Sequence, residues 1–300
     1  IGILGCANIA ERSMIPALLQ LSSMFEIELV ASRSLDKAEK FAKKFNIDFC
    51  VGYDSLINNK ALDAIYVPLP TGLHEEWVTK ALDAGKHVLV EKSIALNLES
   101  AEKMAELAKV KNLVLMESFM FCHHSQHTWV KSLLKTDQIG DFRLFRSQFG
   151  FPPMEPSNFR YNKEIGGGAL LDAGAYTLKA AQLVLGKSLE VISAVLYIDK
   201  ETDVDIYGNM SLMNNDGVVA QLSFGFDNAY KCNYEIWGSK GDLTLEKAFT
   251  PKPEEEPIVK VTSKNTTRIL NLPSDNHFIG ILKDFHSSVV EDNTECIDDF

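Results

Sequence analysis

The sequence has few cysteines, no long apolar run and no signal-peptide pattern. Its five cysteines are scattered, and no two have the spacing of a zinc knuckle or a redox motif. We interpret them as reduced thiols of a soluble, cytoplasmic protein. No apolar run approaches the roughly 20 residues of a membrane span. The start lacks the charged flank and apolar stretch of a signal peptide.

Basic residues are also in deficit, because 30 Lys and Arg stand against 41 Asp and Glu, for a net charge of -11. This balance argues against a general affinity for nucleic acid or membranes, although an anionic cofactor needs only local positive charge. The 300 residues, 46% of them hydrophobic, are enough for two domain cores. The chain begins inside an apolar run at Ile1 and stops in mid-element over 295–300, so we expect further residues at both ends.

Residues 1–118 alternate short apolar runs with amphipathic segments. Strands are predicted at 1–4, 28–31, 64–67, 87–90 and 113–116, and helices at 9–21, 36–45, 73–84 and 98–109. Apolar strands between amphipathic helices are typical of a parallel sheet covered on both faces. We therefore predict an α/β Rossmann domain over 1–118, with a doubly wound sheet that binds its ligand at the carboxyl ends of the strands.

After residue 118 the pattern changes to alternating strands with two helices. The helices are predicted at 126–134 and 169–185, and the strands at 142–149, 191–198, 205–213, 218–226, 230–237 and 241–245. Hairpin-type turns are predicted at 214–217 and 238–241, and an exposed acidic loop at 251–257. We predict an α+β domain over 119–300 with a large, mostly antiparallel open sheet and helices on one face.

A small-residue turn follows the first predicted strand, in the segment Gly5-Cys6-Ala7-Asn8-Ile9-Ala10. It matches the dinucleotide fingerprint, with alanine at the second and third small positions. The glycine permits the tight turn, and the small residues let backbone N–H groups approach a pyrophosphate at the positive end of the helix. An ordinary strand-to-helix turn is the alternative, but the strand before and the helix after favour a dinucleotide site.

The second strand ends without the acidic residue that an NAD site uses for the ribose 2′-hydroxyl. Ser32 and Arg33 stand there instead, and a hydroxyl and a guanidinium suit a 2′-phosphate. We therefore predict NADP(H) as the cofactor, although a solvated arginine is the alternative. Asp36, just beyond, is interpreted as a helix N-cap.

Three separated residues suggest acid–base chemistry on a carbonyl. Lys92 ends a strand at the expected cofactor edge, and Asp172 and Tyr176 lie four apart on a predicted helix. Reduction by hydride requires a proton donor at the oxygen, and a lysine cation favours the phenolate of a nearby tyrosine. Alone, each of the two is more commonly a solvated lysine or a packed tyrosine; with the fingerprint, we predict that Lys92 and Tyr176 act together as a catalytic pair.

The chain resembles the glucose–fructose oxidoreductase / inositol dehydrogenase / MocA family. The matching segments are Gly5–Ala10, Pro70–His74, Glu91–Ser93, Glu117–Met120, Asn158–Tyr161 and Gly166–Tyr176. The resemblance implies Lys92 as the catalytic lysine of a Glu-Lys-Pro motif and Asp172 as a substrate-orienting carboxylate. It also implies an open sheet that often forms a dimer or tetramer interface. Cofactor contacts are implied for Pro68, Pro70 and His74, for Glu91 near the nicotinamide ribose, and for Arg160 near the nicotinamide end.

Two departures refine the resemblance. Ser93 replaces the usual proline, which removes a fixed φ and predicts a looser lysine loop. Tyr176 stands where many members carry histidine, as in the branch with nucleotide-sugar 3-ketoreductases and dimeric dihydrodiol dehydrogenase. That branch mostly uses NADP, and the segments after Glu117 and Asn158 look most like its nucleotide-sugar ketoreductases.

A histidine-rich segment raises the alternative of a metal site. His123, His124 and His127 lie three or four apart beside Cys122, so a pair of imidazoles could bind a metal. The segment lacks a HExxH pattern and a clear third ligand. We predict no metal, and expect these side chains to line the substrate pocket or to cap the next helix.

The leading hypothesis is therefore an NADP(H)-dependent oxidoreductase acting on CH–OH groups of a carbohydrate, with a nucleotide-linked keto sugar as the substrate. The same residues serve an NADP-dependent dehydrogenase of free aldoses or trans-dihydrodiols. A non-catalytic dinucleotide sensor is the alternative from another class, and the presence of both Lys92 and Tyr176 argues against it. We expect a homo-oligomer, a dimer or a tetramer, built through the C-terminal sheet, and no nucleic-acid or membrane partner.

Overall fold

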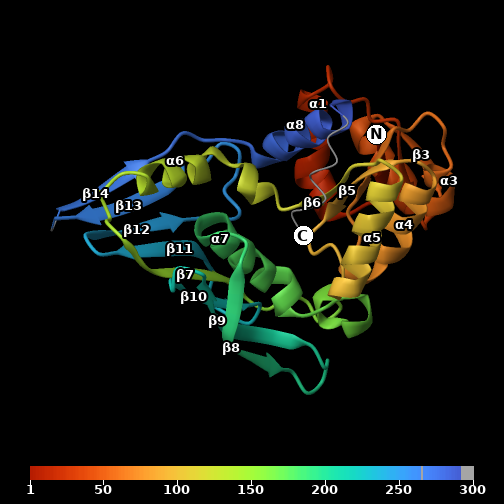
Figure 1. Ribbon diagram of the computed structural model, residues 1–300. Coiled ribbons are helices and arrows are strands. Elements are labelled where there is room, and N and C mark those ends of the chain that lie inside the picture. The colour runs from red at the N-terminus through yellow and green to blue at the C-terminus, as the bar shows by residue number, and fades with distance from the viewer. Residues whose placement is uncertain (265, 292–300) are drawn as a thin grey trace. The chain divides into compact units, whose positions relative to one another are not determined.

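The computed structural model describes residues 1–264 and 266–291, which fall into two compact units (Figure 1). The first unit comprises Ile1–Ser118 and the described residues from Phe278 on, and the second comprises Phe119–His277. The sequence analysis placed all of 119–300 in one second domain. Helix α8 (His277–Val290) corrects this assignment, because it groups with the first unit, where the ring of His286 packs edge-on against that of Phe25 at 5.6 Å. The segment 295–300 lies outside the described residues.

A six-stranded parallel sheet forms the centre of the first unit. Its strands are β1 (Gly2–Leu4), β2 (Leu29–Ser32), β3 (Asp48–Val51), β4 (Ala64–Val67), β5 (His87–Glu91) and β6 (Leu115–Ser118). They lie in the order β3-β2-β1-β4-β5-β6, and every pair is parallel. This is a doubly wound sheet, as predicted from the sequence, in which the strand order reverses between β1 and β4: β2 and β3 lie on one side of β1, and β4, β5 and β6 lie on the other. The unpredicted strand, β3, is short and mostly exposed at the sheet edge.

Helices cover both faces of this sheet. They are α1 (Ile15–Gln20), which continues a π-helical turn at Ala10–Met14, α2 (Leu35–Phe45), α3 (Tyr53–Ile57), α4 (His74–Asp83) and α5 (Leu98–Val110). On one face, Leu4, Ile65 and Val88 of the strands pack in one core with Val78 of α4 and Met104 of α5. Their sequence neighbours point to the opposite face and are buried as well.

The second unit is an eight-stranded sheet with helices on one face (Figure 1). Its strands are β7 (Phe142–Gly150), β8 (Leu189–Ile198), β9 (Asp205–Asn214), β10 (Val219–Gly225), β11 (Lys231–Gly238), β12 (Gly241–Glu246), β13 (Ile258–Ser263) and β14 (Thr266–Asn271). The order is β14-β13-β12-β11-β7-β10-β9-β8. Only the β7–β10 pair is parallel, so the sheet is mostly antiparallel, as predicted. The helices are α6 (Ser125–Leu134) and α7 (Ala175–Leu185).

Alternation along the strands separates a covered face from an open one. In β7, Phe145 and Phe149 are buried beneath the helices, whereas Arg146 is exposed on the other face and donates to Gln221 of β10 at 3.0 Å. Strand β8 is partly or fully exposed along its whole length, with Val195 70% exposed. Across the described ranges, 1–264 and 266–291, no helix has both the length and the apolar character needed to cross a bilayer.

Candidate active site

The turn after β1 has the geometry that a dinucleotide fingerprint requires. Gly5 has a φ of +128°, and a Cβ there would lie 2.9 Å from a side-chain carbon of Leu69, so only glycine fits. The helical turns begin at Asn8, and the N–H of Glu11 is the first to bond back, to the Ala7 carbonyl at 3.1 Å. Helical N–H groups before Glu11 have no carbonyl one turn earlier, so this end of the helix suits an anion.

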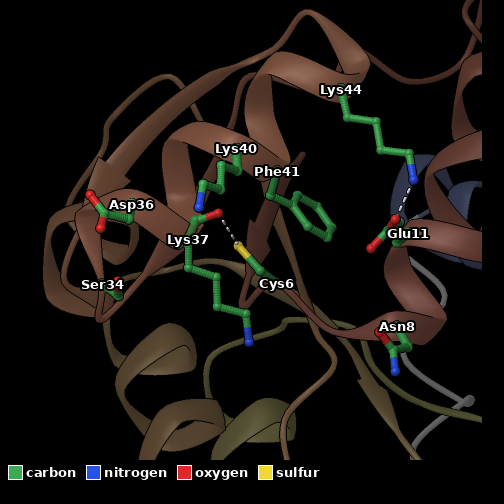
Figure 2. Close-up of a pocket in the computed structure, with 9 residues that line it drawn as sticks. All are labelled: Cys6, Asn8, Glu11, Ser34, Asp36, Lys37, Lys40, Phe41 and Lys44. Atoms are coloured by element: carbon green, nitrogen blue, oxygen red, sulfur yellow. Dashed lines mark hydrogen bonds and ion pairs between the residues drawn. The ribbon is translucent and has the colours of Figure 1, made fainter.

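A hollow of about 470 Å³ lies beside this turn, between the start of the first helix and α2 (Figure 2). It is lined by Cys6, Asn8, Glu11, Ser34, Asp36, Lys37, Lys40, Phe41 and Lys44. Figure 2 shows Lys44 pairing with Glu11, and the Cys6 thiol facing the Lys37 carbonyl oxygen at 3.8 Å. Burial raises the pKa of the Cys6 thiol, which favours its neutral form. The hollow therefore combines a small-residue turn with a lysine-rich helix, which suits a phosphorylated ligand.

Neither Ser32 nor Arg33, the two residues at the end of β2, lines this hollow, and their contact with a 2′-phosphate stays a prediction. Ser32 is buried, and its Oγ accepts the Ser34 N–H at 3.3 Å. Arg33 is exposed and outside the hollow, where its charge opposes the rise that burial causes in the Tyr53 pKa. The interpretation of Asp36 as an N-cap is wrong, because α2 begins at Leu35 with Ser34 at the N-cap position. The sequence analysis missed the lysines of α2, which their Lys-x-x-Lys-x-x-x-Lys spacing on one helix face could have revealed.

Lys92 follows β5 at the carboxyl edge of the first sheet, directly after Glu91. The Tyr66 hydroxyl donates a hydrogen bond to Glu91 Oε1 at 2.6 Å. Burial raises the pKa of Glu91, while Tyr66 and the Lys92 cation act against the rise. The peptide bond between Lys92 and Ser93 is cis. The Glu91 side chain is thus engaged with Tyr66, and its expected contact with the nicotinamide ribose stays a prediction.

His74 differs from its expected role as a residue lining the cofactor. It has no exposed surface, and its two ring nitrogens face the carbonyl oxygens of Leu69 on one side and Ser93 and Ile94 on the other. Leu69 is the residue between Pro68 and Pro70, so the ring contacts the backbone of the proline loop from within. Burial lowers the pKa of His74, and its carbonyl neighbours oppose that shift. We conclude that His74 supports two loops and presents no atom at the surface.

In the second unit, Asp172 and Arg160 form a two-point ion pair. The Arg160 Nε donates to Asp172 Oδ2 and its Nη2 donates to Oδ1 at 3.3 Å. Arg160 also lies over the Phe159 ring at 4.6 Å. The sequence analysis assigned both residues to the site without predicting that they pair. Asp172 lies in a π-helical turn, Leu170–Gly174, which precedes α7.

The glycine-rich segment before this turn packs on the Arg160 loop. The N–H of Gly168 donates to the Arg160 carbonyl at 3.0 Å, and a Cβ at Gly167 would lie 2.5 Å from the same oxygen. Asp205 of β9 accepts the Leu170 N–H at 2.6 Å, at the start of the π-helical turn, and burial raises its pKa. No sequence motif pointed to Asp205, because it lies 35 residues from its partner.

Tyr176, at the second position of α7, is only 6% exposed and sits among aromatic rings. Its ring packs against Phe119, Phe121, Phe149 and Phe249 at centroid distances of 5.0–6.0 Å. Its hydroxyl faces the Met120 sulfur at 3.8 Å. Lys92 belongs to the first unit and Tyr176 to the second, so their pairing stays a prediction.

The histidine-rich segment is built into the core of the second unit. The Nδ1 of His124 accepts the Gln126 N–H at 3.1 Å and caps α6, which agrees with the capping alternative. His127 is buried between the Tyr234 hydroxyl and the Ala248 carbonyl, both at 3.1 Å. Among the residues that the structure describes, no group of three or more His, Cys, Asp or Glu side chains is arranged to hold a metal ion.

The fold and the first unit's hollow define a class: a dinucleotide-binding Rossmann unit joined to a unit with a large open sheet. Residues 1–119 match the oxidoreductase family with an NAD-binding Rossmann fold, GFO/IDH/MocA, and residues 127–244 match the C-terminal domain of the same family. The chain belongs to the GFO/IDH/MocA oxidoreductases. The expected family and fold are confirmed.

Similar proteins include sugar-nucleotide reductases. A dTDP-3,4-didehydro-2,6-dideoxy-alpha-D-glucose 3-reductase from Saccharopolyspora spinosa is 41% identical over 92% of this chain and 83% of its own length. A 3-ketoreductase from Actinomadura kijaniata, solved with NADP and TDP-benzene, has a TM-score of 0.96 at 40% identity, over 99% of this chain and 92% of its own. Variants of that ketoreductase with one tyrosine changed to phenylalanine, or one lysine changed to alanine, have also been solved with both ligands.

Proposed function

We propose that this protein is an NADP(H)-dependent ketoreductase that reduces a keto group on a nucleotide-linked sugar. One observation carries the proposal beyond the family. The tyrosine and the lysine changed in the Actinomadura ketoreductase variants are separated along that chain by the same number of positions as Lys92 and Tyr176 here. The coincidence supports a shared pair of reacting side chains, in a relative that was solved with a thymidine-diphosphate ligand.

The residues of the first unit fit the cofactor. The Gly5 turn leads into the N-terminus of the helix, where N–H groups suit a pyrophosphate, and the adjacent hollow offers Lys37 and Lys40 to a further phosphate. When bound, NADPH supplies the hydride that converts the ketone carbon to the alcohol. We propose that Lys37, with Ser34 beside it, binds the 2′-phosphate alongside Ser32 and Arg33.

The remaining chemistry falls to side chains of this chain. The Tyr176 hydroxyl donates its proton to the ketone oxygen as that oxygen gains charge, and the Lys92 cation stabilises the phenolate that remains. A proton from water then restores the tyrosine. Asp172, held by Arg160, accepts a hydrogen bond from a hydroxyl of the sugar and so orients the sugar ring. The apolar rings around Tyr176 exclude water from the proton donor.

The test follows nicotinamide absorbance with nucleotide-linked keto sugars and NADPH, and with free aldoses and dihydrodiols and NADP+. We expect fast NADPH oxidation by a nucleotide-linked ketone only. Lys92→Ala and Tyr176→Phe should lower kcat by about 10²- to 10⁴-fold, the usual contribution of a positioned acid, and leave NADPH binding intact. Tyr234→Phe is the matched control, because Tyr234 is equally buried in the second unit but faces His127. Full activity of both variants would contradict the mechanism.

We also propose that the protein forms a homo-oligomer through the open sheet. Both faces of β8 carry exposed apolar side chains: Val191, Ile192, Val195, Leu196, Tyr197 and Ile198. Exposed contiguous apolar surface of this kind marks interaction sites. The next strand adds Tyr207, whose ring stacks on that of Tyr197 at 4.8 Å.

A further inference from the structure

The His74 ring connects two loops at the carboxyl edge of the first sheet. Its Nε2 lies 2.7 Å from the Leu69 carbonyl oxygen, and its Nδ1 lies 2.9 Å from that of Ser93 and 3.2 Å from that of Ile94. Leu69 follows β4, and Ser93 follows β5, the parallel neighbour of β4. The ring therefore ties the proline loop to the backbone immediately after Lys92.

The same backbone is fixed from its other side by β6. The Ile94 N–H donates to Glu117 Oε1 at 2.8 Å, and β6 is the other parallel neighbour of β5. The carbonyl of Ser93 and the N–H of Ile94 belong to the same peptide group, so His74 and Glu117 engage its two ends. Ser93 itself has no ring to fix its φ. His74 and Glu117 thus restrain the loop after Lys92, whereas Ser93 within that loop cannot restrain it as a proline ring would.

We propose that His74 and Glu117 are positioning residues for Lys92, which hold this peptide group so that the ammonium lies where the proton donor needs it. The proposal rests on the proposed ketoreductase function. Neither side chain reaches the reacting atoms in this role; both act through the backbone of Ser93 and Ile94. A displacement of about 1 Å at a reacting group can lower a rate by about 10²-fold, so this support matters for turnover.

The chemistry of the ring sharpens the proposal. Carbonyl oxygens only accept hydrogen bonds, and a neutral imidazole carries a single N–H, so the neutral ring donates to one loop at a time. An asparagine amide nitrogen falls near the Nδ1 position and can still donate to Ser93. A glutamine amide nitrogen falls near the Nε2 position and can donate only to Leu69. The two substitutions therefore separate support of the lysine loop from support of the proline loop.

The experiment compares three variants of His74 (His74→Asn, His74→Gln, His74→Ala) and two of Glu117 (Glu117→Ala, Glu117→Gln). The readouts are kcat, KM, NADPH affinity and amide hydrogen exchange of the segment containing Ile94. We expect His74→Ala, His74→Gln and Glu117→Ala to lose about tenfold to 10²-fold in kcat, with NADPH affinity retained and faster exchange at Ile94. His74→Asn and Glu117→Gln keep the relevant donor or acceptor and should recover most of the rate.

His87→Asn is the matched control at the amino end of the same strand. The Nδ1 of His87 accepts the Val114 N–H at 3.0 Å, so this histidine also binds backbone, but far from Lys92 along β5. Equal losses of kcat in His87→Asn, His74→Asn and His74→Ala would mean that the substitutions act only by lowering the stability of the fold. That result would overturn the proposal. An unchanged kcat in folded His74→Ala and Glu117→Ala would overturn it as well.

Hydrogen exchange separates this proposal from the proposed function. If the unaltered protein reduces no keto sugar, the ketoreductase function fails, and faster exchange at Ile94 in His74→Ala still supports the restraint of the lysine loop. Unchanged exchange at Ile94 in that variant overturns the restraint, whatever the substrate proves to be.

Discussion

Arg160 holds Asp172 by two parallel contacts, Nε to Oδ2 and Nη2 to Oδ1, and both side chains are mostly buried, at 22% and 12% exposed. A planar guanidinium matches a carboxylate in this way, and an ammonium cannot. The pair fixes the direction in which the Asp172 carboxylate points, which is what a substrate-orienting group requires.

Arg160→Lys should therefore impair the orientation of the substrate more than the fold. We expect KM for the sugar substrate to rise and kcat/KM to fall by about tenfold, because one charge-assisted contact is worth about 1.5 kcal/mol. Arg160→Ala removes the guanidinium from a mostly buried carboxylate and should also lower the free energy of unfolding by about 2 kcal/mol. Steady-state kinetics and urea unfolding measure the two effects. Unchanged kinetics in Arg160→Lys would show that the two-point geometry is irrelevant to catalysis.

The hollow beside the fingerprint predicts how the protein selects NADPH over NADH. Lys37 lines the hollow, whereas Lys43 of the same helix is exposed and outside it. We expect Lys37→Ala to weaken NADPH binding by about tenfold, the value of one charge-assisted hydrogen bond. NADH binding should be unchanged, because NADH lacks the 2′-phosphate that Lys37 is proposed to bind.

Lys43→Ala is the control for the change in net charge, and Arg33→Ala tests the residue that the sequence suggested. Fluorescence titration of each variant with both cofactors gives the affinities. An equal loss of NADPH and NADH affinity in Lys37→Ala would place the lysine away from the 2′-phosphate.

Two buried histidines of the second unit predict a fall in stability with acid. Burial lowers the pKa of His127 and of His277 to about 3, whereas unfolded histidine titrates near 6.5. Below about pH 6.5 the unfolded chain binds protons that the folded protein does not. The free energy of unfolding therefore decreases as the pH falls from about 6.5 toward 3. Each histidine contributes about 1.4 kcal/mol per pH unit in that window.

Urea unfolding between pH 7.5 and 5 measures this slope. In His127→Gln we expect the slope to decrease by about one proton, whatever the change in stability at pH 7.5. An identical slope in the variant and the unaltered protein would mean that His127 titrates normally in the folded state.

If the exposed strand β8 forms the oligomer interface, one charged side chain introduced into β8 should disrupt the oligomer. Val195 is 70% exposed, and Val195→Asp would place a carboxylate in the proposed interface, where burial without a partner is costly. We expect a smaller species in sedimentation experiments and an unchanged circular dichroism spectrum. Val110→Asp is the control, because Val110 is 72% exposed at the end of α5 in the first unit. The same mass for Val195→Asp and the unaltered protein would exclude β8 from the interface.

The sequence determined features that depend on local periodicity and local turns. The apolar strand before Gly5 and the amphipathic segment after it identified the Rossmann unit, because strand and helix periods are legible over about ten residues. Hairpin turns such as Asn214–Gly217 marked the second sheet for the same reason. The short edge strand β3 and the strands β13 and β14 escaped prediction, since short strands with mixed side chains carry a weak periodic signal.

Only the tertiary structure decided which distant residues meet. Asp205 caps a turn 35 residues before it, and α8 returns to the first unit, because long-range contacts are set by strand order and helix packing. His74 and Ser93 both stood in recognised motifs, yet their contact depends on β4 and β5 being neighbours. The sequence by itself predicted the chemical groups of a site; the fold determined which of them support the others, because hydrogen bonds between loops exist only once the strands have paired.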